Sequence, residues 1–183
     1  MKNKLGLITL SVASLFSLTL ASCGSNNNNK KILDAFNKVV TVAKTLEQDI
    51  TISNKNMVVA TENVVINFEN NKKTTTSKVA NDLTAETPWT ETTNTVDFDS
   101  KKAKLSLKEN MFSSLDLAET TLKGVVSNDS VLKVFGISSD VIDGDVKIEF
   151  TVSSLTDIKV ETVELNYVSI NGNDVEIVCT YSY

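Results

Sequence analysis

The sequence contains no histidine, and because all 18 of its basic residues are lysines it contains no arginine either. Serine and cysteine nucleophiles are commonly activated by a histidine, so catalytic centres of that kind are excluded. Zinc sites lose one of their usual ligands for the same reason. The six glycines are isolated from one another, so the chain has no glycine-rich phosphate-binding loop. We therefore expect that the protein is not an enzyme and has no cofactor.

Carboxylate chemistry needs neither histidine nor arginine, and the chain has 23 acidic residues. Asp97 and Asp99 are two apart on one predicted strand, but no spacing singles out a catalytic pair. Asp140, Asp143 and Asp145 flank Gly144 in a way that is faintly similar to a calcium loop. They do not follow the Asp-x-Asp-x-Asp-Gly spacing, and no glutamate stands at the twelfth position. We interpret this segment as a solvated turn, with a calcium site as the alternative.

The N-terminus has the layout of an export signal: Lys2 and Lys4 precede an apolar run over residues 5–20, and small residues follow. The run is shorter than the roughly 20 residues that a membrane-spanning helix needs. Leu20-Ala21-Ser22-Cys23 resembles the lipobox of bacterial lipoproteins. The resemblance implies that residues 1–22 are a signal peptide and that Cys23, carrying a diacylglyceryl group, becomes the first residue of the mature chain. Ordinary secretion and an uncleaved anchor are the alternatives.

This resemblance implies attachment to the extracytoplasmic face of the cell membrane, and a two-chain lipid is enough for stable attachment. Removing residues 1–22 leaves 16 lysines against 23 acidic residues, so the mature chain carries a net charge of −7. Affinity for nucleic acid depends on lysine and arginine, so we expect no nucleic-acid partner. The membrane contact is then made by the lipid and not by a basic face.

Beyond Cys23, the pattern predicts a flexible tether over residues 23–31 and a single α+β domain over residues 32–183. Apolar residues recur at spacings of three and four over residues 32–50, which predicts an amphipathic helix. Alternation with period two predicts strands near residues 64–68, 72–83, 90–98 and 103–107. Helical spacing returns over residues 113–124 and 128–136, which predicts a short helical insert.

The C-terminal third carries the strongest strand signals, over residues 146–152, 158–167 and 174–183. The apolar register of the second strand shifts near Glu161-Thr162, which predicts a β-bulge, and Asn171-Gly172 predicts a two-residue hairpin turn. Together these elements predict one curved antiparallel sheet of about six to seven strands, packed with the N-terminal helix and the insert. In element order this domain is similar to the half-barrel carriers of lipoproteins and lipids, whose concave sheet is lidded by helices.

Two residues stand out from their surroundings. Cys179 has no partner once Cys23 is lipidated, and it shares a predicted strand face with Val175, Ile177 and Tyr181. We interpret it as a small buried apolar residue, with a disulfide-linked dimer as the alternative. Trp89 follows Pro88 in a polar, threonine-rich context, and we expect it to pack under a sheet edge, with an exposed contact residue as the alternative.

These observations lead to two hypotheses about function. The first is a lipid-anchored, non-catalytic surface protein that binds a protein partner whose identity the sequence does not give. The second is a carrier that holds a lipid or another apolar small molecule between the concave sheet and the helices. Apolar cavities suit such ligands, but sequence does not distinguish a filled core from a hollow one.

Overall fold

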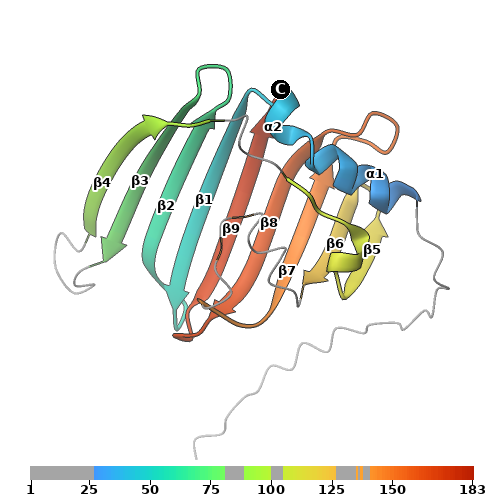
Figure 1. Ribbon diagram of the computed structural model, residues 1–183. Coiled ribbons are helices and arrows are strands. Elements are labelled where there is room, and N and C mark those ends of the chain that lie inside the picture. The colour runs from blue at the N-terminus through green and yellow to red at the C-terminus, as the bar shows by residue number, and fades with distance from the viewer. Residues whose placement is uncertain (1–26, 81–88, 100–104, 127–134, 136, 138–140) are drawn as a thin grey trace, which may run out of the picture.

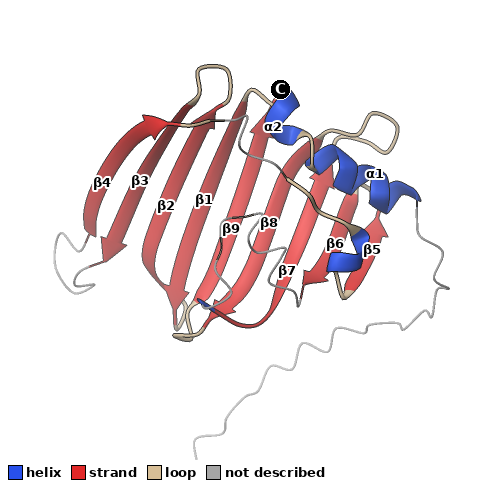
Figure 2. Cartoon of the chain, in the orientation of Figure 1, coloured by secondary structure: helices blue, strands red, loops and turns tan. Residues whose placement is uncertain are grey.

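The computed structural model describes residues 27–80, 89–99, 105–126, 135, 137 and 141–183. These residues form one open antiparallel sheet of nine strands in the order β4-β3-β2-β1-β9-β8-β7-β6-β5, with few helices, so the chain is mostly β (Figures 1 and 2). The strands are β1 (Thr45–Asn54), β2 (Met57–Asn67), β3 (Lys72–Ala80), β4 (Trp89–Asp97), β5 (Ser114–Ala118), β6 (Thr121–Val126), β7 (Ile142–Val152), β8 (Val160–Ser169) and β9 (Asp174–Ser182). The helices are α1 (Asn27–Phe36) and α2 (Val39–Val42), with a 3-10 turn, η1 (Glu109–Met111).

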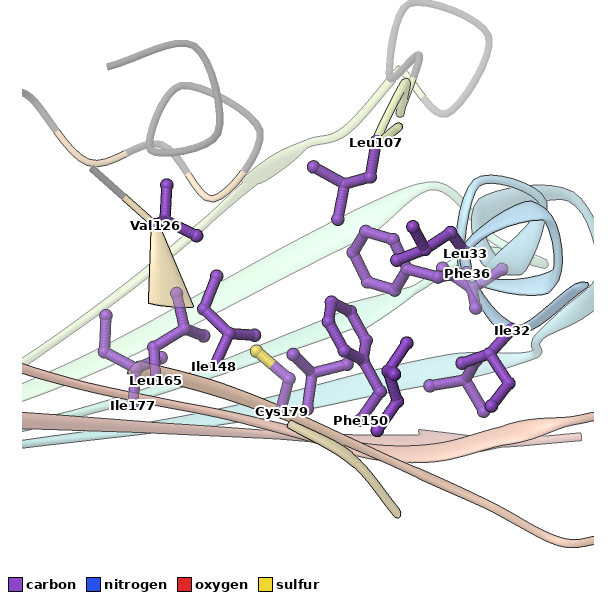
Figure 3. Close-up of a cluster of buried hydrophobic side chains, with 14 of the residues drawn as sticks. Ile32, Leu33, Phe36, Leu107, Val126, Ile148, Phe150, Leu165, Ile177 and Cys179 are labelled. Atoms are coloured by element: carbon purple, nitrogen blue, oxygen red, sulfur yellow. The ribbon is translucent and has the colours of Figure 1, made fainter. Parts of the chain in front are cut away.

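The core lies on one face of the sheet, under α1. Alternate residues of β7 and β9 are buried, as period-two alternation requires of strands with one wet face. Ile32, Leu33 and Phe36 of α1 are at most 2% exposed and meet these strand residues (Figure 3). The expectation that the N-terminal helix packs on the apolar face of a single antiparallel sheet is therefore confirmed. The expected α+β class and the expected six to seven strands are wrong, because segments predicted to be helical pair as strands and the sheet has nine.

Asn37 fixes a second cover for this core. Its side-chain Nδ2 donates to the carbonyl oxygen of Leu107 at 2.9 Å, and the amide of Leu107 donates to Asn37 Oδ1 at 2.7 Å. This two-way bond ties the segment after β4 to the end of α1, and it places the 2% exposed side chain of Leu107 over the sheet (Figure 3).

The expected helix over residues 32–50 is wrong in its second half. Helix α1 ends at Phe36, and residues from Thr45 onward form β1, which pairs with both β2 and β9. Leu46 and Ile50 are four residues apart, a spacing that fits one face of a helix and one face of a strand equally well. Helix α1 also begins at Asn27, inside the segment expected to be a flexible tether.

The expected helix over residues 113–124 is also wrong, because β5 and β6 form a hairpin there. Leu115, Leu117 and Leu122 lie on its core-facing side, and Glu119 turns the chain with a φ of 53°. Gly124 is not a helix stop: a Cβ at this position would come within 2.6 Å of the Phe112 ring, so only glycine allows the ring to lie there. The second expected helix, over residues 128–136, falls almost wholly outside the described residues.

Other strand predictions are confirmed with changed limits. The strands expected near residues 64–68, 72–83 and 90–98 correspond to β2, β3 and β4, and the three C-terminal strands to β7, β8 and β9. Thr151 and Val152 pair with Thr162 and Val160, so Glu161 is the extra residue of the predicted bulge. Gly172 adopts a φ of 73° in the turn between β8 and β9, but this loop runs from residue 170 to 173 instead of having two residues. The strand expected at residues 103–107 is not formed in its described part, residues 105–107.

Strands β2, β3 and β4 extend beyond the main core. Their buried apolar residues are Val64 and Ile66, which lie outside the cluster formed by α1 and the C-terminal strands. Every residue of β4 is exposed. This part of the sheet is held by strand pairing and by cross-strand side-chain pairs. Because no described helix covers it, its surface is open to contact with other molecules.

Candidate functional site

The sheet face opposite α1, which we call the outer face, is exposed to solvent in the described structure. One cross-strand row runs over this face through all nine strands, and each member pairs with the next. We call it the outer row; from β4 to β5 it consists of Thr93, Thr76, Asn63, Asp49, Val178, Glu164, Glu149, Lys123 and Asp116. The row is polar at every position except Val178, so it is suited to a hydrated contact.

Hydrogen bonds order the threonine side of the outer row. The Thr76 and Thr93 hydroxyls lie 3.2 Å apart, and Asn63 Nδ2 donates to Asp49 Oδ1 at 2.8 Å and to Glu47 Oε1 at 3.1 Å. A hollow of about 440 Å³ opens at this point, and its lining includes Asp49, Asn63, Thr76, Lys78 and Glu91. These side chains offer both donors and acceptors on a surface held by strands.

The charge of the outer row is mainly negative. Glu149 and Glu164 lie directly opposite each other on β7 and β8, an arrangement of like charges that is unfavourable by itself. Lys123 offsets it, since its Nζ lies 2.8 Å from Glu149 Oε1. The hydrogen bond and the charge of Glu149, with weaker effects of Glu164 and Asp116, raise the pKa of Lys123. The row as a whole holds four carboxylates and one lysine, so it favours a partner that brings positive charge.

A groove of about 790 Å³ lies between the outward side of α1 and the loop that joins β7 to β8. Its apolar wall includes Val42, Leu155, Ile158 and Tyr183, and Lys31, Lys38 and Lys159 stand around it. Asp34 is paired with Lys30 at 2.8 Å, and Lys159 lies 3.7 Å from Asp157 and 6.0 Å from the centre of the Tyr183 ring. The combination of an apolar wall and lysines is that of a site for an anionic amphiphile.

The space between α1 and the sheet is filled by side chains where the structure describes it. The Phe36 ring lies 5.3 Å from the Phe150 ring, 5.5 Å from the Phe135 ring and 6.5 Å from the Tyr181 ring, measured between centroids. Figure 3 shows Phe36 of the helix and Phe150 of the sheet pointing toward each other. A ligand held by the described helices would therefore lie outside this core, for example in the groove beside α1.

The predicted site residues are not brought together. Cys23 and Asp140 lie outside the described residues, and Asp143 and Asp145 belong to β7. No three histidine, cysteine, aspartate or glutamate side chains in the described part of the chain are placed to hold a metal ion. Asp97 is paired with Lys72 at 2.6 Å, and the hydrogen bond and charge of this lysine lower the pKa of Asp97.

Trp89 corrects a prediction. It was expected to pack under a sheet edge, but it begins the edge strand β4 and is 39% exposed. No helix or second layer of the described structure covers this end of the sheet, so the ring stays partly exposed to water. The sequence signal was the polar context on both sides of Trp89, which contains no apolar partner at alternating positions.

Cys179 is buried, as predicted, with 2% of its surface exposed and no disulfide. It faces the core from β9, between Ile177 and Tyr181. Burial in this apolar environment raises the pKa of its thiol from the ordinary 9.0 to about 12, although a hydrogen bond with Gln48 acts in the other direction. The thiol is therefore protonated and poorly nucleophilic at neutral pH.

Comparisons with known proteins add little. No family model matches the chain, and no curated protein matches it. Among solved structures the chain is similar to the dehydratase domain from the terminal module of the rifamycin polyketide synthase, at 8% identity and a TM-score of 0.22, over 85% of this chain and 80% of that one. A likeness this low carries no functional argument. Within the described residues, no helix is long and apolar enough to cross a membrane.

The buried thiol gives the first prediction. The pKa of Cys179 is raised in the folded state, so the folded protein keeps the thiol proton at pH values where the unfolded chain loses it. The contribution of this proton to the free energy of unfolding is therefore complete below about pH 9 and is lost as the pH rises toward about 12. Above pH 9 the free energy of unfolding of the wild type should fall more steeply with pH than that of Cys179→Ala, by at most about 1.4 kcal/mol per pH unit. Urea unfolding at a series of pH values measures both slopes.

The Cys179→Ala control removes the thiol but keeps the tyrosines, which also titrate at alkaline pH. Parallel curves for the two proteins would contradict the prediction. Equally, alkylation of Cys179 by iodoacetamide in the folded protein at pH 8, at the rate of an exposed thiol, would show that the side chain is not buried.

Proposed function

We propose that the protein is a lipid-anchored, extracytoplasmic, non-catalytic binding protein whose outer face makes the contact with its partner. The observation that carries this proposal is the one-sided sheet: α1 covers one face, and the outer row lies exposed on the other. Helix α1 begins four residues after Cys23. Because each residue spans at most about 3.6 Å, a lipid on Cys23 would lie within roughly 14 Å of the start of α1.

This geometry supports an outward-facing role for the outer row. Membrane attachment near α1 leaves the opposite sheet face free, and strands hold their side chains more rigidly than loops do. Threonine hydroxyls both donate and accept hydrogen bonds, and the carboxylates accept them. We therefore propose a partner with a polar surface that carries positive charge. Proteins with clusters of lysine or arginine fit this description.

The anchor is tested by the intact mass of the protein purified from membranes. The expected product begins at Cys23 and carries the added mass of a diacylglyceryl group, with or without a third acyl chain. Cys23→Ser should give an unprocessed chain without lipid, because the serine hydroxyl does not replace the thiol in this modification. A wild-type chain that keeps residues 1–22, or that begins at Cys23 with no lipid mass, would contradict the anchor.

The contact surface is tested by binding measurements on the purified lipoprotein in detergent, against a panel of extracellular-matrix proteins and cell-envelope polysaccharides. Asp49→Asn with Glu164→Gln, both on the outer row, should weaken binding to the bound component by about tenfold, the loss of one or two charge-assisted contacts. Higher salt should weaken the wild-type interaction as well, because exposed charges are screened.

The matched control removes two carboxylates elsewhere. Asp34→Asn with Asp157→Asn changes the charge by the same amount at the groove beside α1 and should leave the binding unchanged. An equal loss in both double variants would rule out a specific role of the outer row. Turnover of a substrate that is abolished by replacing a single carboxylate would overturn the non-catalytic assignment.

The groove beside α1 supports a second candidate function, that of a carrier for an anionic amphiphile such as a fatty acid. Its apolar wall suits an acyl chain, and Lys31 and Lys38 lie where a carboxylate or phosphate head would enter. Native mass spectrometry of the mature protein with added oleate should show a one-to-one complex that Lys31→Glu with Lys38→Glu abolishes. Asp49→Asn with Glu164→Gln is the control that should keep it. An unchanged complex in the lysine variant would exclude the groove.

A further inference from the structure

The two edges of the sheet differ in length and in cover. At one edge, β5 has five residues and lies beside the core, to which Leu115 and Leu117 contribute. At the other, β4 has nine residues, all of them exposed, and among the described strands it pairs only with β3. A long exposed edge presents backbone donors and acceptors that are ready to pair with another strand.

Strand β4 lacks several of the features that usually protect an edge. Residues 89–97 contain no lysine, proline or glycine, and the nine residue pairs with β3 continue without a bulge. Lys72 and Lys73, which occur near a turn in the sequence, belong to β3 and not to the edge. Natural sheets use lysine, proline, bulges or short strands to prevent edge pairing, so the absence of all four from this strand is informative.

The charges of β4 are also neutralised from within the molecule. Glu91 is paired with Lys78 at 3.1 Å, and Asp97 is paired with Lys72 at 2.6 Å. Hydroxyl pairs between β3 and β4, Thr74 with Thr95 at 3.0 Å and Thr76 with Thr93 at 3.2 Å, hold the edge in an extended form. Strand β4 can therefore pair with a second strand without uncompensated charge and without a change in its backbone conformation.

We propose that β4 pairs antiparallel with β4 of a second copy of the chain, around a two-fold axis at Thr93, so that the two sheets become continuous. A two-fold axis normal to the sheet keeps corresponding faces together. In this register all nine residues pair: Trp89 lies opposite Asp97 of the second copy, Glu91 opposite Thr95, and Thr93 opposite itself. No two like charges are opposed, and threonine pairs are favourable across strands.

Neighbouring two-fold registers are worse. An axis at Asn94 would place Glu91 opposite Asp97 of the second copy, and like charges directly opposite are destabilising. An axis at Thr92 would leave Val96 and Asp97 without partners. The strand is thus self-complementary in the one two-fold register that pairs its whole length, and this property favours a second copy over an unrelated peptide.

The arrangement is compatible with two anchors in one membrane. Rotation about an axis normal to the sheet leaves α1 of both copies on the same face, so both anchors emerge on one side. The position of the anchors rests on the proposed lipid anchor, whereas the strand pairing does not. A single pair of nine-residue strands makes a small interface, which is typical of weak association. Confinement to a membrane raises the effective concentration and strengthens such a contact.

Cysteine crosslinking of the full chain in its native membranes tests the proposal. Thr93→Cys places two thiols opposite each other at the axis, where the Cβ atoms of paired residues lie about 4.5–5.5 Å apart, close to the roughly 4.5 Å that a disulfide allows. Thr95→Cys lies on the same face, but the two copies of residue 95 would be four positions apart along the paired strands, about 13 Å. Mild oxidation should therefore give about tenfold more disulfide dimer with Thr93→Cys than with Thr95→Cys. The wild type should give none, because Cys179 is buried and the thiol of Cys23 carries the proposed lipid.

A second variant tests whether the disulfide comes from specific pairing or from random collisions between chains in the membrane. Adding Thr93→Lys to Asn94→Cys places two lysines opposite each other at the axis, so it should lower the yield of crosslinked dimer below that of Asn94→Cys alone. The variant also loses the hydroxyl pair with Thr76, so circular dichroism is needed to check that its sheet still forms. Equal crosslinking by Thr93→Cys and Thr95→Cys, no crosslinking by either, or a Thr93→Cys adduct with the mass of a different protein would overturn pairing with a second copy. Loss of membrane association with the crosslink retained would overturn the anchor alone.

Discussion

The contact of Phe36 with the C-terminal strands determines which face of the sheet is buried and which is exposed to water. Phe36 is 1% exposed and lies against Phe150 and Tyr181, and the two-way hydrogen bond of Asn37 then fixes the chain around Leu107 over the same region. Burying one apolar side chain of this size contributes about 1.5–3 kcal/mol. Because α1 and the Leu107 segment cover the same end of one face, the opposite face and the β4 edge remain open.

Much of the strand order follows from the sequence, and two of the errors share a cause. The period-two pattern correctly predicted β2, β3, β4 and the three C-terminal strands, and the shift of apolar register correctly predicted the bulge at Glu161. Two of the failures, β1 and the β5–β6 hairpin, involve apolar residues that are four apart, such as Leu46 with Ile50 and Ala118 with Leu122. Such a spacing satisfies both periods, and the decision is made by pairing with distant strands, here β1 with β9. No local pattern contains that information.

The same limit applies to the candidate sites. Burial of Cys179 could be predicted, because its neighbours on the strand alternate clearly between apolar and polar. The outer row could not, since it requires the registers of eight strand pairs at once. The position of β4 at an edge also depends on the pairing of β1 with β9, from Thr45 with Ser182 onward. This pairing joins the N-terminal strands β1 to β4 and the C-terminal strands into one sheet. The sequence of residues 89–97 alone does not show whether this strand lies at an edge or in the middle of a sheet.

Strands β2 to β4 are stabilised in a different way from the strands under α1, and this difference bears on function. Their exposed ion pairs, such as that of Lys78 with Glu91, each contribute between 0 and about 1 kcal/mol, so these pairs are not the main source of stability. Threonines suited to strands, the hydroxyl pairs between β3 and β4, and the small buried contribution of Val64 and Ile66 hold this part of the sheet together. The core beneath α1 depends on none of these side chains. The surface of β2 to β4 can therefore change without loss of the core, and a surface with that freedom is well placed to adapt to a binding partner.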